Sequence, residues 1–194
     1  MSGYLSRRKP VLLGIGGTLR PGSSSELALR SALAAATDAE TEIIAASDLD
    51  FPNYDPERAD AVEGARRLID AVRRADGLLV ATPGYHGGMS GLIKNALDYL
   101  QALAGDASPY LHGKAVGCIV SAAGWQAGAT TLTSLRTTVH ALRGWPTPLG
   151  VVVNSMTKPF AADGEILDAK IGEQLTCVAE QVVTFARLRL SAPP

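Results

Sequence analysis

The sequence of 194 residues contains only two cysteines, no excess of either charge, and no apolar run of the roughly 20 residues that a membrane-spanning helix needs. Cys118 and Cys177 form no C-x-x-C motif and lie in apolar surroundings, so we expect two buried thiols and no disulfide framework. Eighteen basic and nineteen acidic side chains give a net charge of −1, whereas nucleic acids and anionic membranes attract basic surfaces. Residues 1–10 lack the apolar stretch of a secretory signal. We therefore expect a cytoplasmic protein that binds neither nucleic acid nor membranes.

Metal-ligating side chains are also sparse. The three histidines, His86, His112 and His140, have neither the helical nor the short-loop spacing of a zinc site, and no carboxylate cluster accompanies them. We therefore expect no metal. Hydrophobic residues make up 46% of the chain and charged residues 19%, as in ordinary globular domains. Length and composition predict a single domain over residues 1–194.

Short apolar segments alternate with segments of helical periodicity along the chain. The expected strands are residues 11–15, 42–46, 77–82, 115–121 and 150–153. The expected helices are residues 24–37, 62–75, 92–103, 130–142 and 168–188. Because parallel strands need crossover connections, and helices in those crossovers cover the sheet, this alternation predicts an α/β fold with a five-stranded parallel sheet. Ligands of such sheets bind beyond the carboxyl ends of the strands, so the loops 16–25, 82–91 and 121–128 are the candidate site.

The first of these loops has the composition of a phosphate site. It holds four hydroxyl side chains and an arginine between a strand and the first turn of a helix, and Ser23 with Glu26 forms an S-x-x-E capping box. The free amides and positive dipole end of a helix N-terminus favour an anion, which hydroxyl groups and arginine also bind. Leu19 breaks the dinucleotide fingerprint and Ser23 replaces the P-loop lysine. The loop therefore suits a terminal monophosphate, the alternative being an ordinary capped turn.

The second loop combines proline, glycines and two ring side chains without any acidic residue. Its glycines let the backbone approach a flat ligand, while Tyr85 and His86 can pack on that ligand or hydrogen-bond to its edge. The alternative is a hairpin or lid without a ligand.

Together the loops resemble the NAD(P)H-dependent FMN reductase family of flavodoxin-like proteins, and the resemblance covers nearly the whole chain. The family pattern G-S-x-R-x-x-S-x-[NST] is matched by Gly17, Thr18, Arg20, Ser23 and Ser25, with threonine for the first serine. The pattern T-P-x-Y-x-x-x-x-x-G-x-x-K-N-x-x-D is matched by Thr82, Pro83, Tyr85, Gly91, Lys94, Asn95 and Asp98. The resemblance implies a flavodoxin-like three-layer sandwich with strand order 2-1-3-4-5.

The resemblance also implies a cofactor site. The FMN phosphate would be bound by Thr18, Arg20, Ser23, Ser24 and Ser25. The isoalloxazine ring would be lined by Pro83, Gly84, Tyr85, His86, Gly87, Ser121 and Gly124. His86 replaces the family's usual asparagine, and Gly84 a frequent glutamate. Trp125, also less typical, is expected either at an interface or in the core. Lys94 and Asp98 are interpreted as an i,i+4 pair or an interface contact, not as catalysts.

The implied activity is hydride transfer from NADPH or NADH to FMN. Such transfer needs stacked rings and little acid–base help, so no catalytic residue is assigned. The segment 160–168 resembles reductases that pass reduced FMN to a separate flavin-dependent monooxygenase. Relatives with the same loops instead retain FMN and reduce quinones, azo dyes or metal oxyanions, and a non-enzymatic electron carrier of flavodoxin type is a further alternative. The resemblance also suggests a homodimer or homotetramer.

Overall fold

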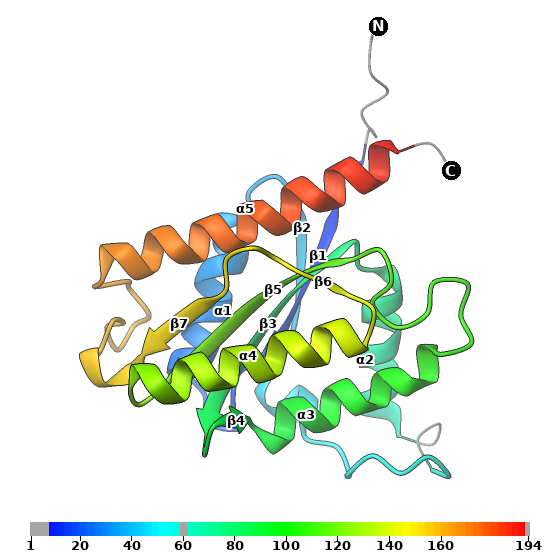
Figure 1. The fold of residues 1–194 in the computed structure, drawn as a ribbon, viewed down its shortest axis with the longest axis horizontal. Helices are drawn as coiled ribbons and strands as arrows, with labels where there is room; N and C mark the ends of the chain where they lie inside the picture. Colours follow the sequence, from blue (N-terminus) through cyan, green and yellow to red (C-terminus); the bar gives the residue numbers. More distant parts are fainter. Residues whose placement is uncertain (1–7, 59–61, 193–194) are drawn as a thin grey trace, which may run out of the picture.

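The computed structural model describes residues 8–58 and 62–192, so residues 1–7 of the N-terminal segment lie outside the description. A parallel sheet forms the middle layer, and helices cover both of its faces (Figure 1). The strands are β1 (Val11–Gly16), β2 (Glu40–Ala45), β3 (Gly77–Tyr85), β4 (Gly88–Met89), β5 (Ala115–Ala122), β6 (Trp145–Pro146) and β7 (Val151–Asn154). The helices are α1 (Ser24–Ala35), α2 (Glu63–Arg74), α3 (Gly91–Asp98), α4 (Trp125–Ala141) and α5 (Ala169–Ser191), with 3-10 turns η1 (Ala46–Leu49), η3 (Tyr99–Leu103) and η4 (Ser155–Thr157).

The order of the strands matches the prediction. The parallel sheet runs β2-β1-β3-β5, and the outer edge of β5 pairs with the short β6 near its start and with β7 near its end. Counting the five predicted strands alone, this is the order 2-1-3-4-5. Two short strands were not predicted: β6, and β4, which pairs antiparallel with the end of β3.

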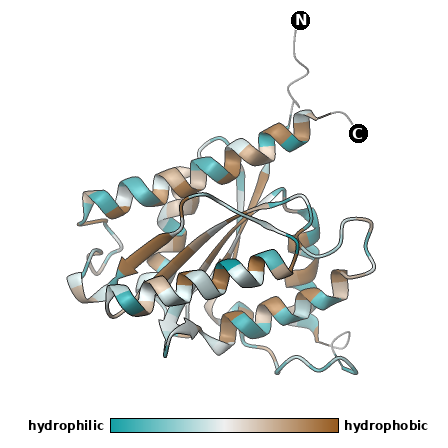
Figure 2. Cartoon of the chain, viewed as in Figure 1, coloured by the Kyte–Doolittle hydropathy of each residue, from teal (hydrophilic) through white to brown (hydrophobic). Residues whose placement is uncertain are grey.

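The core consists of two apolar layers, one on each face of the sheet. Adjacent residues of β1 point to opposite faces, so Leu12 packs with α1 and α5 while Leu13 packs with the residues of α2, α3 and α4. Both side chains are fully buried. Figure 2 shows the consequence, because the central strands are hydrophobic along their length while the helices alternate between hydrophobic and hydrophilic faces.

Several predictions need correction. Helix α4 begins at Trp125 instead of residue 130, and the core interpretation of Trp125 is wrong, since the residue is 60% exposed. Strand β3 continues past Thr82 to Tyr85 before it turns into β4. Cys118 is buried as expected, but Cys177 is only partly buried; both are free thiols. The other predicted elements differ from the structure by a few residues at their ends or, for the helix after Gly91, by a final 3-10 turn.

Candidate functional site

Two adjacent pockets lie at the carboxyl ends of the strands. The first, which we call the serine pocket, has a volume of about 220 Å³ and is lined by Thr18, Arg20, Ser23, Ser24, Ser25, Pro83, Gly84, Tyr85, Ser121, Ala122, Ala123 and Ser155. The second, the leucine pocket, has a volume of about 520 Å³ and is lined by Thr18, Leu19, Arg20, Tyr85, Ser90, Gly91 and Leu92. Because Thr18, Arg20 and Tyr85 line both, the two pockets form neighbouring parts of one cleft.

The floor of the serine pocket is the first turn of α1. Ser23 is the N-cap of this helix, and its hydroxyl accepts a hydrogen bond from the Glu26 amide at 3.4 Å. The hydroxyl groups of Ser23 and Ser25 lie 3.3 Å apart, and both residues are buried. The amides of Ser24 and Ser25 belong to the first turn, where no helical carbonyl can accept from them. Buried hydroxyls and free amides therefore converge at the positive end of the α1 dipole.

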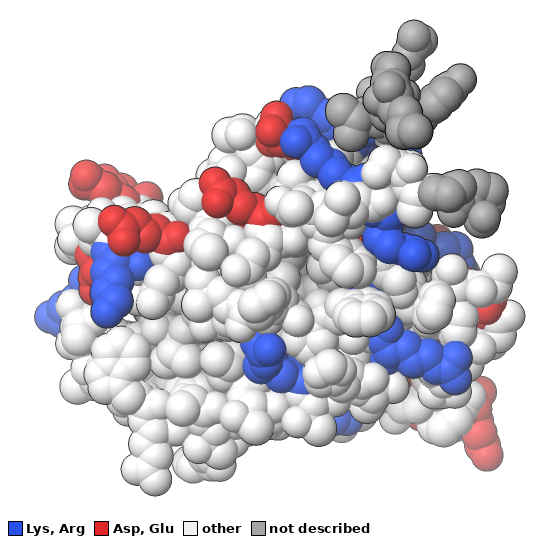
Figure 3. All heavy atoms as spheres, turned by 45° about the horizontal axis from the view of Figure 1, so that its top comes forward, with Lys and Arg blue, Asp and Glu red and all other residues white. Residues whose placement is uncertain are grey.

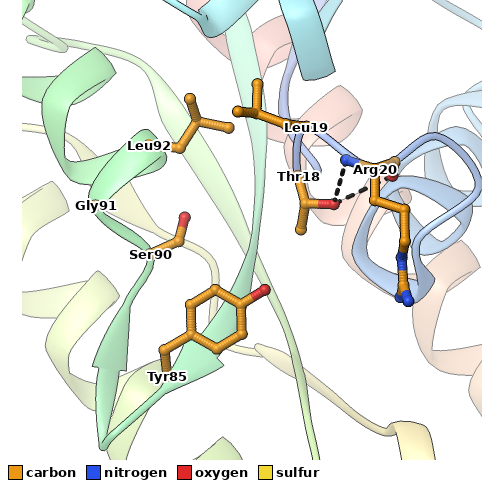
Figure 4. A pocket seen from close by; sticks show the side chains of 7 residues that line it. All are labelled: Thr18, Leu19, Arg20, Tyr85, Ser90, Gly91 and Leu92. Atoms are coloured by element: carbon orange, nitrogen blue, oxygen red, sulfur yellow. Dashed lines mark hydrogen bonds between the residues drawn. The ribbon is translucent and has the colours of Figure 1, made fainter.

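Thr18 closes the loop above this floor. Its Oγ1 accepts from the Arg20 amide and donates to the Arg20 carbonyl, each at 3.1 Å (Figure 4). The Arg20 side chain is exposed, and no carboxylate among the described residues forms an ion pair with it. Arg20 is also the one charged residue that lines the serine pocket. The guanidinium group is therefore available to an anionic ligand.

The wall opposite the helix is the end of β3 and its hairpin. Pro83, Gly84 and Tyr85 line the serine pocket, whereas His86 and Gly87 form the two-residue loop between the paired residues Tyr85 and Gly88. Both loop residues have positive φ, 51° and 84°, as the favoured type I′ hairpin turn requires. Neither His86 nor Gly87 lines either pocket.

The third predicted loop contributes only in part. Ser121, at the end of β5, is buried and lines the serine pocket, but Gly124 does not. Gly124 instead precedes α4 with a φ of 117° and offers no side-chain cap to the helix. Ala122 and Ala123, which belong to the predicted loop 121–128 but were given no individual role, also line the pocket, whereas sequence reasoning missed Ser155. Ser155 follows β7 directly, so the rule that ligands bind at the carboxyl ends of strands would have found it.

The leucine pocket is lined by residues of two predicted loops, 16–25 and 82–91, and by Leu92 just beyond them, but sequence reasoning gave Leu19, Ser90 and Leu92 no role. Leu19 and Leu92 point toward one another across it, and the Tyr85 hydroxyl is directed toward the side formed by Thr18 (Figure 4). Ser90 caps α3 by accepting from the Ile93 amide at 3.3 Å, so its hydroxyl is already engaged. Because Arg20 and Tyr85 line the pocket as well as these two leucines, and no acidic residue does, it suits a group with an apolar face and polar edges.

The K-N-x-x-D segment serves structure. Lys94 and Asp98 form the expected i,i+4 ion pair, with Nζ–Oδ distances of 2.6 and 2.8 Å. Asn95 instead hydrogen-bonds to the loop after η1: its Oδ1 accepts from the Tyr54 amide at 2.7 Å, and its Nδ2 donates to the carbonyls of Phe51 and Pro52. This helix therefore holds the neighbouring loop in place.

On the face shown in Figure 3 the basic and acidic side chains are scattered, and neither sign forms a continuous patch. Among the described residues, no three His, Cys, Asp or Glu side chains gather where they could bind a metal ion. No helix in residues 8–58 and 62–192 is long and apolar enough to cross a bilayer.

Comparison with known proteins gives the family. The model of the NADPH-dependent FMN reductase family matches residues 10–158. The chain belongs to this family. An NAD(P)H-dependent FMN reductase of Pseudomonas aeruginosa is 32% identical over 164 residues, which cover 84% of this chain and 87% of that protein. An NADPH azoreductase of a Bacillus species (strain OY1-2) is 30% identical over 144 residues, covering 73% and 72% of the two chains.

Solved structures agree on the fold. The flavoenzyme FerB of Paracoccus denitrificans, an NAD(P)H:(acceptor) oxidoreductase, superposes with a TM-score of 0.76 at 23% identity, covering 94% of this chain and 99% of FerB. The flavodoxin-like fold is thus confirmed. Membership of the FMN reductase family confirms three further predictions: an oxidoreductase enzyme, FMN as the flavin, and a nicotinamide nucleotide as the hydride donor.

Proposed function

We propose that the cleft binds FMN, with its phosphate in the serine pocket, and that the protein catalyses reduction of FMN by NADPH or NADH. The observation that supports this most strongly is that three kinds of donor converge at one end of the cleft. They are the buried hydroxyls of Ser23 and Ser25, the first turn of α1, and Arg20, which forms no ion pair with a carboxylate among the described residues. These donors fit a terminal phosphate, which carries about −1.5 to −2 charges and three acceptor oxygens.

The walls of the cleft then position the flavin ring. In this proposal the flavin ring would be held by Pro83, Gly84, Tyr85 and Ser121, which line the serine pocket at the paired ends of β3 and β5. His86, Gly87 and Gly124, in the loops next to these strand ends, would complete the ring site. When bound, FMN accepts a hydride from the nicotinamide and passes the electrons on. The residues of the cleft contain no acid–base pair, so their contribution is to bind, to orient and to exclude water.

Anaerobic mixing of the protein with FMN and NADPH, and separately with NADH, tests the reductase activity. Protein-dependent loss of the visible absorbance of FMN is expected, and the faster nucleotide is the preferred donor. Binding of FMN without any bleaching, together with reduction by a separate reductase, would instead identify an electron carrier. Failure to bind FMN at all would refute the proposed use of the serine pocket.

Two candidate functions differ in what receives the electrons from reduced FMN. We propose that reduced FMN leaves for a flavin-dependent monooxygenase in the cytoplasm, on the basis of the 160–168 segment, and that the protein acts as a homodimer or homotetramer. The azoreductase relative favours the second candidate, an enzyme that retains FMN and reduces azo compounds or quinones. Gel filtration after loading with FMN separates the candidates: flavin that elutes apart from the protein supports the first, and flavin that co-elutes with it supports the second.

A further inference from the structure

Glu26 places a buried negative charge directly behind the serine pocket. Its side chain is 9% exposed, and it follows Ser25, which lines the pocket, within the first turn of α1. The carboxylate oxygen Oε2 accepts a hydrogen bond from the Gly22 amide at 3.1 Å, and thereby holds the loop that carries Arg20. The positive end of the helix dipole stabilises a carboxylate here just as it would stabilise a phosphate.

Arg30 balances this charge from one helical turn further along. Its Nε and Nη2 lie 2.9 and 2.8 Å from the Glu26 Oε1. The Arg30 side chain is 55% exposed, so water partly screens the pair. The charges near the serine pocket are therefore two positive and one negative. Arg20 belongs to the lining of the pocket, whereas Glu26 and Arg30 lie behind it.

We propose that the Glu26–Arg30 pair sets the affinity of the serine pocket for the phosphate group of FMN. This inference rests on the proposed function. With both residues present, the single net positive charge only partly balances a phosphate of about −1.5 to −2. By offsetting the charge of Arg30, Glu26 thus keeps the affinity low enough for FMN to exchange, as the first candidate function requires. Both residues act as positioning and charge-balancing groups, because neither lines the pocket.

Two single substitutions should change the affinity in opposite directions. Glu26→Gln keeps a side-chain oxygen that can accept from Gly22 but removes the negative charge, so FMN should bind roughly threefold to tenfold more tightly. Arg30→Met keeps the aliphatic stem but leaves Glu26 without its cation, so FMN should bind roughly threefold to tenfold more weakly. In the double variant the two charge changes cancel, and the affinity should return to near the wild-type value.

Riboflavin, which lacks the phosphate, provides the matched control ligand. Quenching of flavin fluorescence measures the dissociation constants of both flavins for the wild type and the three variants. The riboflavin constant divided by the FMN constant then gives the phosphate-dependent part of the affinity. The ratio should rise for Glu26→Gln, fall for Arg30→Met and recover in the double variant, while the riboflavin constants stay within about twofold of the wild type. Thermal melting of each apoprotein checks that all four chains are folded.

The outcomes are distinct. If both single variants lower the affinity for FMN and riboflavin alike, the pair has a purely structural role and the inference is wrong. If the ratio is unchanged in every variant although wild-type protein prefers FMN to riboflavin, the inference fails but the proposed function stands. If wild-type protein binds FMN and riboflavin equally, the serine pocket does not recognise phosphate, and the proposed function fails at that step.

Discussion

Asn95 and Lys94 are neighbours in the same helix, yet the structure predicts very different costs for removing them. Asn95 makes three hydrogen bonds to the loop before α2, and its side chain is half-buried. Each such bond contributes about 0.5–1.5 kcal/mol net, and a buried partner left without a replacement costs more. The Pro52 carbonyl still accepts from the Tyr99 hydroxyl at 3.1 Å, so the main losses concern Phe51 and Tyr54. Asn95→Ala should therefore lower the free energy of unfolding by about 2 kcal/mol.

Lys94→Ala is the matched control. It removes an exposed i,i+4 ion pair with Asp98, which contributes about 0.3–0.5 kcal/mol. Urea titrations of the apoproteins measure both changes, and a thermal scan should show a decrease of about 4–8 °C for Asn95→Ala in a domain of this size. A third variant, Asn95→Asp, keeps an acceptor for Tyr54 but sets a carboxylate against two carbonyls, and it should be no more stable than Asn95→Ala. The reasoning is refuted if Asn95→Ala and Lys94→Ala have costs within about 0.5 kcal/mol of each other.

Three further predictions concern the cleft and the core. Arg20→Ala should weaken FMN binding by about 1.5–3 kcal/mol, the value of a hydrogen bond to a charged group, as measured by fluorescence titration. Arg58 is the control, because its side chain is 85% exposed and lies outside the cleft. Arg58→Ala should leave the dissociation constant unchanged. His86→Asn should raise the free energy of unfolding, measured by urea titration, by about 0.5–1 kcal/mol, because asparagine tolerates the left-handed conformation of a type I′ turn better than histidine does. An unchanged free energy of unfolding would show that the positive φ of His86 costs no stability. Burial raises the pKa of Cys118 to about 12, so the folded state retains the thiol proton that the unfolded chain loses from about pH 9, and stability should fall between these values by up to about 1.4 kcal/mol per pH unit. A Cys118→Ala variant should show a shallower fall over the same range, and equal slopes would contradict the prediction.

Sequence patterns predicted the central strands and the helices because burial imposes a strong periodicity. Residues 11–15 and 115–121 are apolar at nearly every position, since both faces of a central parallel strand are covered. The phosphate-binding composition of the loop after β1 was also recognisable from the sequence, because a capping box explains Ser23 and Glu26 but not the additional hydroxyl groups and Arg20. All five residues expected to bind phosphate do line the serine pocket.

The errors arose where glycine and proline serve tertiary packing. Gly128 suggested a loop, but it lies within α4, where a side chain would collide with Val152. Gly84 suggested the end of a strand, whereas an added Cβ would lie 2.8 Å from the Thr131 hydroxyl, so the absence of a side chain lets β3 pass under α4. Pro83 is compatible with the strand because β1 pairs with β3 only as far as Ala81. A local pattern cannot distinguish a glycine that turns the chain from one that lets two elements touch.

The same close packing explains how a cleft without an acid–base pair can support a reaction. Hydride transfer depends on holding two flat rings in contact, so the walls have to be rigid rather than reactive. The α4–β3 contact at Gly84 and the α4–β7 contact at Gly128 fix the wall opposite α1, while the Glu26–Gly22 hydrogen bond fixes the loop on the α1 side. The leucine pocket beside them combines two leucines, Leu19 and Leu92, with the polar side chains of Thr18, Arg20, Tyr85 and Ser90. Rigid walls on both sides of the serine pocket therefore suit the proposed hydride transfer, which depends on how the two rings are held and not on an acid–base group.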